Sequence, residues 1–331
     1  MPGKGTGGAF ISGLGGFVPE NILTNQDLER MVDTSDEWIQ TRTGIRERRI
    51  ASPQQATSDL ATEAALNAIA DAGLTPQEID LIICATVTPD NIFPSTACLI
   101  QRNLRNQTAA AFDISAACSG FIYGLSLAEM FVSTGRHRHV LVIGAETLSR
   151  FTDWKERSTC VLFGDAAGAV VVSPAQGESR ILSVHLFADG RFSDLLVIPS
   201  GGSRQPCTHE TLDKRQHYIH MKGNETFKIA VKSLVNASVT ALEHNHVTAD
   251  HVDLFISHQA NTRIIQAAAE RLGVSDERVV ITVDRFGNTS AASIPTALWD
   301  LSVQGRIARG NMILLAAFGG GLTWGSALIR W

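Results

Sequence analysis

The sequence has few cysteines, and their arrangement argues against two kinds of site. Its five cysteines are an odd number at wide, irregular spacings, and no two of them form a Cys-x-x-Cys pair. Neither a disulfide framework nor a zinc site is indicated. Cys84 and Cys160 lie in apolar runs, where a cysteine usually serves as a small hydrophobic residue. We therefore expect a reducing compartment.

Long apolar runs and an excess of positive charge are also missing. No apolar run approaches the roughly 18 residues that span a bilayer. The segment Met1–Gly5 lacks the apolar core of a signal peptide. A formal charge of −5 argues against nucleic-acid binding, which normally requires a basic face. We expect a cytoplasmic protein with neither a membrane nor a nucleic acid as a partner.

What is present is the pattern of a layered α/β protein. The 331 residues suffice for a sizeable core in one large or two ordinary domains. Short apolar runs rich in Val, Ile and Leu, typical of strands covered on both faces, alternate with helical patterns. This alternation predicts helices packed on sheets. The expected strands are Ala9–Ser12, Leu81–Thr86, Ala110–Ile114, Val140–Gly144, Ala169–Ser173, Leu254–Ser257 and Met312–Ala316, and the expected helices are Ser58–Ala72, Gly120–Thr134, Glu225–Glu243 and Thr262–Leu272.

A weak internal repeat suggests duplication. The segment Thr75–Ile83 resembles Thr248–Ile256, 173 residues later, and Val140–Ile143 resembles Met312–Leu315 at an offset of 172. Two matches at nearly the same offset favour a duplicated unit over chance, with the halves meeting near residue 175. The expected halves are residues 1–174, with a candidate nucleophile, and 175–331.

One stretch breaks the pattern. Residues 203–219 are polar, contain one proline and show no steady period. We expect a surface loop there that could cover a site entrance.

Cys118 is the candidate nucleophile. Its segment Asp113–Gly120 follows an expected strand, precedes an apolar helix and is rich in small residues, which allow a sharp turn that exposes one side chain. A cysteine at a helix start feels the positive end of the helix dipole, which favours the thiolate. The alternative is a buried structural cysteine, and the segment alone does not decide between them.

Two further segments carry candidate polar groups. His258 lies between an expected strand and an expected helix, where its side chain could face a site or cap the helix. Asn288 lies in a turn of small residues, where asparagine also occurs for backbone reasons. Two histidine pairs, in 137–139 and 244–246, lack nearby cysteines or a carboxylate triad, so we expect solvated loop histidines and no metal site.

Together the three residues resemble the Cys–His–Asn triad of β-ketoacyl-acyl-carrier-protein synthase III, of the thiolase superfamily. The resemblance covers nearly the whole chain. It implies an α/β thiolase-like fold in which two duplicated βαβαβ halves form five αβαβα layers, and Asp165 in a structural turn. The motifs that carry it, besides those of the triad, are Thr34–Ile39, Arg42–Arg48, Phe163–Asp165 and Phe318–Gly325.

The resemblance also implies an acyltransferase reaction. Cys118 would attack an acyl-coenzyme A primer, with acetyl expected, to form an acyl-enzyme. The backbone N–H groups of Cys118 and Gly320 would form the oxyanion hole. Malonyl-acyl-carrier protein would then lose carbon dioxide, with His258 and Asn288 stabilising the enolate without a metal or other cofactor. The product would be a β-ketoacyl-carrier protein that begins fatty acid biosynthesis.

Binding roles follow from the same resemblance. Trp38 would stack on the coenzyme A adenine together with Arg157, and Arg42 would meet the nucleotide phosphates. Asn261 would also contact coenzyme A. Phe93 would bound the acyl pocket of a neighbouring subunit in a homodimer. The segment expected to dock the carrier protein consists of Gln259, Ala260, Asn261, Thr262 and Arg263.

Three other functions stay open. A specialised synthase of secondary metabolism could keep the same triad. A non-catalytic acyl-binding subunit would be expected to lack the nucleophile, which Cys118 provides. A cysteine hydrolase would need a base beside the cysteine and water access, and would not require Asn288.

Overall fold

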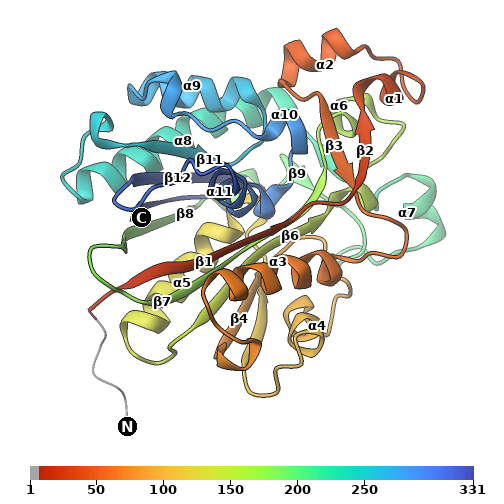
Figure 1. Ribbon diagram of the computed structural model, residues 1–331. Coiled ribbons are helices and arrows are strands. Elements are labelled where there is room, and N and C mark those ends of the chain that lie inside the picture. The colour runs from red at the N-terminus through yellow and green to blue at the C-terminus, as the bar shows by residue number, and fades with distance from the viewer. Residues whose placement is uncertain (1–6) are drawn as a thin grey trace.

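Two β-sheets form the frame of the protein. The computed structural model describes residues 7–331 (Figure 1). The first sheet has the strand order β1 (Ala9–Phe17), β7 (Asp165–Pro174), β6 (Val140–Thr147), β4 (Leu81–Ala85), β5 (Ala110–Ile114). The second has the order β11 (Leu254–Ser257), β12 (Met312–Gly319), β13 (Thr323–Arg330), β8 (Arg180–Ala188). Two short pairs lie outside these sheets, β2 (Asn21–Thr24) with β3 (Glu47–Ile50) and β9 (Leu196–Val197) with β10 (His220–Met221).

Helices cover both sheets and fill the space between them, which gives five layers (Figure 1). The outer layer on the first sheet is α3 (Thr57–Asp71) and α4 (Thr96–Asn103), the central layer is α5 (Gly120–Ser133) and α11 (Ser293–Val303), and the outer layer on the second sheet is α8 (Gly223–His244) and α9 (Thr262–Leu272). Three buried apolar clusters fill the interfaces between these layers. The remaining helices are short: α1 (Asn25–Glu29), α2 (Asp36–Thr43), α6 (Arg157–Cys160), α7 (His209–Asp213) and α10 (Val283–Phe286).

The thiolase-like fold and its duplication are confirmed by the strand registers. Parallel strands β4 and β6 align Leu81 with Val140, and parallel strands β11 and β12 align Leu254 with Ile313. Both pairs are related by an offset of 173. The offset of 172 expected for the second match was therefore one residue short. The boundary between residues 174 and 175 falls between β7 and β8, and the division into two halves there stays a prediction.

All seven expected strands and all four expected helices are present. Two core strands, β8 and β13, were not expected from the sequence. β8 has an irregular burial pattern because it is the edge strand of its sheet, and β13 begins with Thr323-Trp324-Gly325, which reads as a turn motif. Neither segment is a continuous aliphatic run, and the pairing of β13 with β12 and β8 holds it in the sheet.

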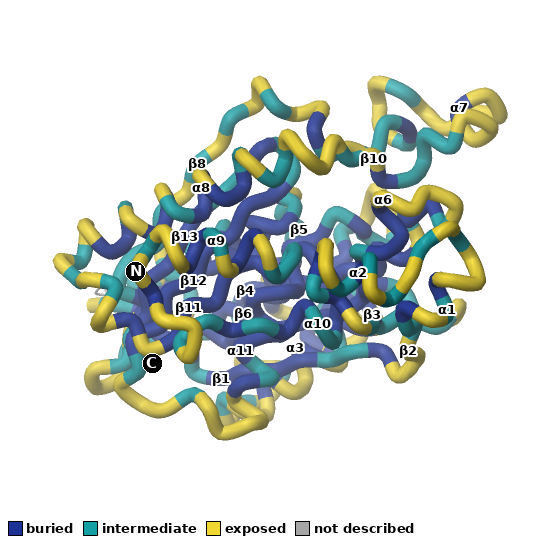
Figure 2. The backbone as a smooth tube through the Cα atoms, turned by 90° about the horizontal axis from the view of Figure 1, so that it is seen from above, coloured by how far each residue is buried: buried dark blue, intermediate teal, exposed yellow. Residues whose placement is uncertain are grey.

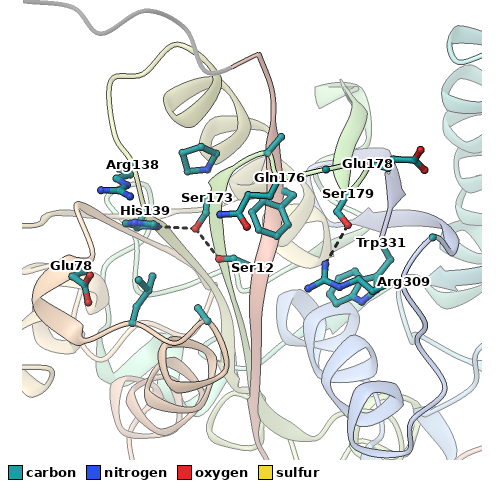
Figure 3. Close-up of a pocket in the computed structure, with 17 residues that line it drawn as sticks. Ser12, Glu78, Arg138, His139, Ser173, Gln176, Glu178, Ser179, Arg309 and Trp331 are labelled. Carbon is teal, nitrogen blue, oxygen red and sulfur yellow. Dashed lines mark hydrogen bonds between the residues drawn. The ribbon is translucent and has the colours of Figure 1, made fainter.

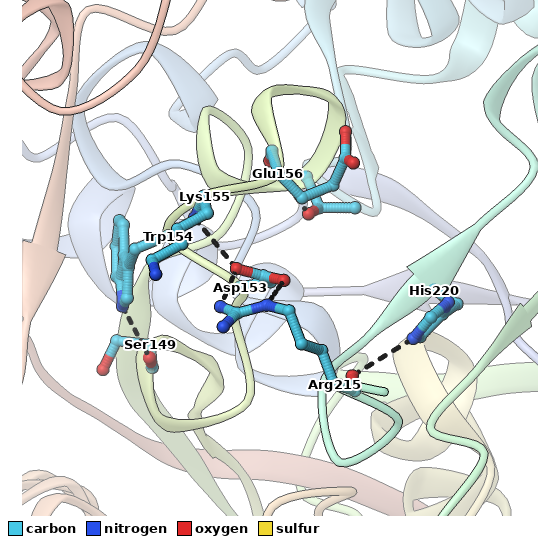
Figure 4. A network of polar contacts seen from close by, with 8 residues as sticks. Ser149, Asp153, Trp154, Lys155, Glu156, Arg215 and His220 are labelled. Atoms are coloured by element: carbon cyan, nitrogen blue, oxygen red, sulfur yellow. Dashed lines mark hydrogen bonds and ion pairs between the residues drawn. The ribbon is translucent and has the colours of Figure 1, made fainter. Parts of the chain in front are cut away.

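The 203–219 segment is not the featureless loop that its sequence suggests. It contains α7, which begins with a capping box between Thr208 and Thr211. The segment projects from the body and is mostly exposed (Figure 2). Its base is fixed where Arg215 pairs with Asp153 through two hydrogen bonds (Figure 4) and the Ile219 N–H donates to the Phe151 carbonyl at 2.8 Å.

Polar residues that could suggest other sites have structural partners. Asp165 begins a strand rather than lying in a turn, and its buried carboxylate accepts the N–H groups of Ala51 and Ser149. His139 is half-buried and hydrogen-bonded to Ser173, so it is not a solvated loop histidine. Within residues 7–331, no group of three or more His, Cys, Asp or Glu side chains is arranged to hold a metal ion. Among the helices described, none combines the length and apolar character needed to cross a membrane.

Candidate active site

A pocket of about 540 Å³ brings the three candidate residues together. Cys118, His258 and Asn288 all line it, although they lie on segments up to 170 residues apart in the chain. All three side chains are buried. Apolar side chains surround them, including Phe163, Leu196 and Phe318. The pocket thus combines a thiol, an imidazole and an amide in a site of low polarity, a setting that strengthens hydrogen bonds to a developing charge.

The turn that presents Cys118 is held by the last strand of the chain. Ala117, just before the cysteine, has φ of +45°, a conformation that side chains rarely adopt. The Thr323 hydroxyl donates to the Ala116 carbonyl at 2.8 Å, and the Ser119 hydroxyl donates to the Thr323 carbonyl at 2.9 Å. These bonds hold the strained turn on both sides of the cysteine.

The sequence predicted that the helix dipole would favour the thiolate of Cys118 and so lower its pKa. This prediction is wrong, because the pKa is raised. The cysteine lies in a 3-10 turn, Ala117–Ser119, and α5 begins only at Gly120. Burial raises the pKa of the Cys118 thiol to about 12. The loss of solvent around a charged sulfur is the largest cause of this shift. The side chain of Cys118 is therefore a neutral thiol at neutral pH.

His258 is held as a neutral imidazole. It follows β11, and its backbone N–H donates to the Ala316 carbonyl at 2.7 Å. Burial lowers the pKa of His258 to about 3. Its Nδ1 lies 2.8 Å from the Ser293 hydroxyl, which accepts the Gln259 N–H at 3.3 Å. The Ser293 proton is then free to donate to Nδ1, which leaves the proton of the ring on Nε2.

The backbone of its own turn orients Asn288. Its Oδ1 accepts the Ser290 N–H at 3.0 Å, so the amide nitrogen is the group left to donate to a ligand. The adjacent Gly287 has φ of +68°, and a Cβ there would come 2.9 Å from the Leu162 carbonyl oxygen. A glycine is therefore required beside Asn288.

The closing loop reaches the nucleophile through Gly319. A Cβ on Gly319 would lie 2.5 Å from the Cys118 nitrogen, whereas one on Gly320 would meet Leu196 instead. Gly319 lines the pocket together with Cys118. The motif had suggested only Gly320, and the close approach of Gly319 could not be read from a run of three glycines.

The pocket lining carries positive charge and no carboxylate. Among residues 7–331, Arg42, Lys228 and Arg263 line the pocket, and no Asp or Glu does. Lys228 was missed by the sequence reasoning, because a lysine in an amphipathic helix normally marks a solvated face. This charge contrasts with the formal −5 of the whole chain. The pocket therefore suits an anionic ligand.

The helix α2 supplies the aromatic platform. Trp38 and Arg42 are four residues apart, so they share a helix face, and both line the pocket. The Ser35 hydroxyl caps the helix by accepting the Trp38 N–H at 3.1 Å. The Arg157 guanidinium lies 4.8 Å from the centre of the Trp38 ring. That distance is one of direct cation–π contact and leaves no room for a base between them.

The segment expected to dock a carrier protein is only partly accessible. Gln259 is 2% exposed, and its amide group bonds to the backbone of Ser257, Val280, Thr282 and Val283. It is therefore a structural residue, and its assignment to docking is wrong. Ala260, Asn261 and Thr262 are half-buried, and Asn261 also caps α9. Arg263 is exposed and lies 5.6 Å from the Phe227 ring.

Phe93 does not line the pocket of its own chain. It is 84% exposed, and the adjacent Ile92 is 86% exposed. Two neighbouring apolar side chains at such exposure form a surface suited to a partner.

A larger depression, of about 1060 Å³, lies away from the triad (Figure 3). Its lining includes His139, Ser173 and Ser12, whose side chains form a hydrogen-bonded chain, together with Arg309 near the C-terminus. It contains none of the triad residues. The candidate active site is therefore not the larger of these two pockets.

Comparisons with known proteins identify the family of this chain. The profile of 3-oxoacyl-[acyl-carrier-protein (ACP)] synthase III matches residues 112–190, and that of the C-terminal part of the same family matches residues 242–331. The beta-ketoacyl-[acyl-carrier-protein] synthase III of Caldanaerobacter subterraneus is 57% identical to this chain, and the match covers 98% of each sequence.

Solved structures give the same result. The 3-oxoacyl-[acyl-carrier-protein] synthase III of Aquifex aeolicus is 50% identical, with a TM-score of 0.91 over 98% of this chain and 100% of that one. The priming β-ketosynthase of a polyketide biosynthetic pathway is 34% identical, with a TM-score of 0.92 over 99% of this chain and 98% of that one.

Proposed function

This chain belongs to the 3-oxoacyl-[acyl-carrier-protein] synthase III family of condensing acyltransferases, and from this premise we propose how its residues initiate fatty acid biosynthesis. The reaction joins an acyl-coenzyme A primer to malonyl-acyl-carrier protein by decarboxylative condensation. The observation that carries the assignment of residues is the single pocket lined by Cys118, His258 and Asn288. We propose that these three residues perform the chemistry.

In the first step, the Cys118 sulfur attacks the thioester carbonyl of the primer, and coenzyme A leaves as the acyl-enzyme forms. The tetrahedral oxyanion needs donors that are already in place. We propose the N–H groups of Cys118 and Gly320 for this role. The close packing of Gly319 on the Cys118 nitrogen supports the proposal, because it brings the closing loop to the nucleophile.

In the second step, malonyl-carrier protein loses carbon dioxide, and negative charge develops on its thioester oxygen. His258, with its proton on Nε2, and the Asn288 amide nitrogen donate to that oxygen. The low pKa of His258, caused by burial, supports a neutral donor that does not become a buried cation. The carbanion then attacks the acyl-Cys118 carbonyl and releases the β-ketoacyl product. No cofactor enters this proposal, because the two hydrogen bonds stabilise the enolate.

The pocket lining supports the binding of a phosphorylated substrate. Arg42, Lys228 and Arg263 would meet phosphate groups, which coenzyme A and the phosphopantetheine arm of a carrier protein both carry. Trp38 offers two faces for the adenine: the one that Arg157 now covers, if Arg157 moves aside, or the opposite one. Asn261, which lines the pocket, would contact coenzyme A. For the acidic carrier protein, we propose Arg263 as the main contact, flanked by Ala260, Asn261 and Thr262.

We also propose a homodimer in the cytoplasm. The exposed Ile92 and Phe93 would be covered by a second copy, where Phe93 would bound the partner's acyl pocket. A reducing compartment keeps a catalytic thiol active. Sedimentation at micromolar concentration should give about twice 35.6 kDa. A clean monomer would contradict this part of the proposal.

The direct test is a product assay with a panel of acyl-coenzyme A primers and malonyl-carrier protein. We expect β-ketoacyl-carrier protein and carbon dioxide, with acetyl as the preferred primer. The likeness to a polyketide priming synthase makes a larger primer the competing result, which would favour secondary metabolism. Release of free acid irrespective of malonyl-carrier protein would instead support a hydrolase.

A mass measurement tests the nucleophile itself. Intact protein incubated with acetyl-coenzyme A should gain one acetyl group, and the Cys118→Ser variant should gain none. Cys207→Ser removes an exposed thiol and should remain fully acylated. An adduct on Cys98 or Cys160 would overturn the assignment of Cys118.

A further inference from the structure

Glu146 is a buried carboxyl group near the nucleophile that the condensation described above does not use. It lies on β6 with no exposed surface. Its carboxylate accepts the N–H groups of Val87 and Thr88, both at 3.1 Å, and the hydroxyl groups of Thr86 at 3.2 Å and Thr88 at 2.6 Å. These hydrogen bonds lower the pKa of Glu146, but burial has the larger effect and raises it to about 7. The group can therefore take up or release a proton near neutral pH.

Ser290 begins the turn Ser290–Ala292, which packs both on β6, the strand that carries Glu146, and on the turn Ala117–Ser119, which carries Cys118. Its buried hydroxyl forms no hydrogen bond of ordinary geometry in the described part of the chain. Burial is the largest cause of the raised pKa of Cys118 and of Glu146. The Ser290 hydroxyl lowers the pKa of each group, which opposes the effect of burial. An unengaged hydroxyl beside a thiol and a carboxyl group is placed to pass a proton between them.

The position of Ser290 is fixed by strain and close packing. Its φ is +47°, unusual for a residue with a side chain, and its N–H donates to Asn288 Oδ1. The turn Ser290–Ala292 packs on β6 so closely that a Cβ on Gly144 would lie 2.1 Å from the Ala291 carbonyl oxygen. Strain of this kind persists only where the surroundings enforce it, and it is frequent at functional sites.

The charges around Glu146 favour it over His258 as the proton acceptor. The charge of Glu146 raises the pKa of Cys118, secondary to burial, so protonation of Glu146 eases the loss of the thiol proton. A proton that moves from the thiol to Glu146 keeps one negative charge in the site, whereas transfer to His258 creates two buried charges. On the two strands that pair with β6, the titratable groups are Cys84 on β4 and Asp165 on β7, and burial raises the pKa of both.

We propose that Glu146 accepts the proton of Cys118 through the Ser290 hydroxyl during acylation, a role that rests on Cys118 being the nucleophile. The thiol proton passes to Ser290 Oγ, and the Ser290 proton passes to the Glu146 carboxylate. At the same time the Cys118 sulfur forms its bond to the thioester carbonyl carbon. When the tetrahedral intermediate collapses, the carbon–sulfur bond to coenzyme A breaks. The departing thiolate takes the proton back from Glu146 through Ser290, which restores the carboxylate.

The test is the pH dependence of single-turnover acylation, followed by intact mass. In the wild type the rate should fall below an apparent pKa near 7, because the carboxylate is the active form. Glu146→Gln should lose this dependence, and its rate at neutral pH should drop about 10²–10⁴-fold, the usual contribution of a proton acceptor. Ser290→Ala should show a similar loss.

A second measurement tests whether Glu146 accepts a proton or only maintains the structure around Cys118. Removing the Glu146 charge lowers the pKa of the thiol, so alkylation of Cys118 by iodoacetamide at alkaline pH should be as fast or faster in Glu146→Gln. Unchanged acylation in Ser290→Ala, or a neutral-pH dependence retained in Glu146→Gln, would overturn the proposal. If Glu146→Gln fails to fold, the acylation rate of Ser290→Ala tests the proposal on its own. Acylation of Cys118→Ser would instead contradict the proposed function itself.

Discussion

Gly319 lies against the backbone nitrogen of Cys118 so closely that a Cβ atom there would come within 2.5 Å of it. Separations under about 3 Å between a Cβ and another heavy atom essentially never occur, and the obstructing atom here is backbone. The absence of a side chain at Gly319 is therefore a condition for the position of the nucleophile. The N–H of Cys118, a proposed oxyanion donor, depends on the same contact.

We expect Gly319→Ala to slow acylation of Cys118 by about 10²–10³-fold, the effect of losing one oxyanion donor, because the turn has to shift. Burst kinetics with acetyl-coenzyme A would measure it. Gly190→Ala is the matched control, since a Cβ at Gly190 meets nothing within 4 Å. Equal rates in the two variants would show that the closing loop does not position Cys118.

His258→Ala and Asn288→Ala should separate the two half-reactions. Neither residue takes the thiol proton in our proposal, so acylation of Cys118 should survive in large part. Release of labelled carbon dioxide from malonyl-carrier protein should fall about 10²–10³-fold in each variant, because the enolate loses one donor.

Asn224→Ala changes an exposed asparagine in the same pocket lining and serves as the control. If acylation collapsed in His258→Ala while decarboxylation persisted, His258 would be the base that activates Cys118. The hydrolase function would then be reopened.

Substitutions of Trp38 and of Arg157 should affect the binding of coenzyme A differently. Because their contact at 4.8 Å leaves no space for a base, the adenine either displaces Arg157 or uses the other face of the ring. Trp38→Ala should raise the KM for acetyl-coenzyme A about 5- to 150-fold at nearly constant kcat, as expected for a lost stacking contact of about 1–3 kcal/mol.

Arg157→Ala distinguishes the two modes of binding. A tighter Kd, measured by calorimetry, would show that Arg157 blocks the base, and a weaker one would show that it stacks on the base. Lys155→Ala removes a neighbouring exposed cation and controls for general electrostatics. An unchanged KM in Trp38→Ala would remove Trp38 from the binding site.

The stability of the protein should fall as the pH drops below 6.5, in part because of His258. Burial lowers the pKa of His258 from 6.5 to about 3, so between these values only the unfolded chain binds its proton. The free energy of unfolding then decreases as the pH falls, by about 1.4 kcal/mol per pH unit from this group.

Denaturant titrations of His258→Gln should show a flatter pH dependence than the wild type. Glu146 contributes with the opposite sign between 4.5 and about 7, since its raised pKa makes the folded state bind the proton first. Its contribution is common to both proteins and cancels in the comparison. His209→Gln, at an exposed position, is the matched control for replacing a histidine by glutamine. Identical curves for all three proteins would argue that His258 is accessible to protons in the folded state.

The sequence by itself determined the layered architecture and singled out the three candidate residues of the site. Buried strands such as Val140–Gly144 are continuous apolar runs, and their period and length identify them without tertiary information. The duplication was visible because Thr75 and Thr248 begin the same turn before a strand. The three residues could be proposed as a triad because Cys118, His258 and Asn288 each stand in a local sequence motif, and the structure places all three in one pocket.

Only the tertiary structure decided which groups are charged, exposed or in contact. The pKa of Cys118 depends on how much solvent the surrounding layers remove, and Gln259 is buried because strands and turns distant in sequence surround it. The contact of Glu146 with Ser290 and the approach of Gly319 to Cys118 join residues 144 and 201 positions apart. Local sequence carries no record of such distances, because they follow from how the two halves pack on each other.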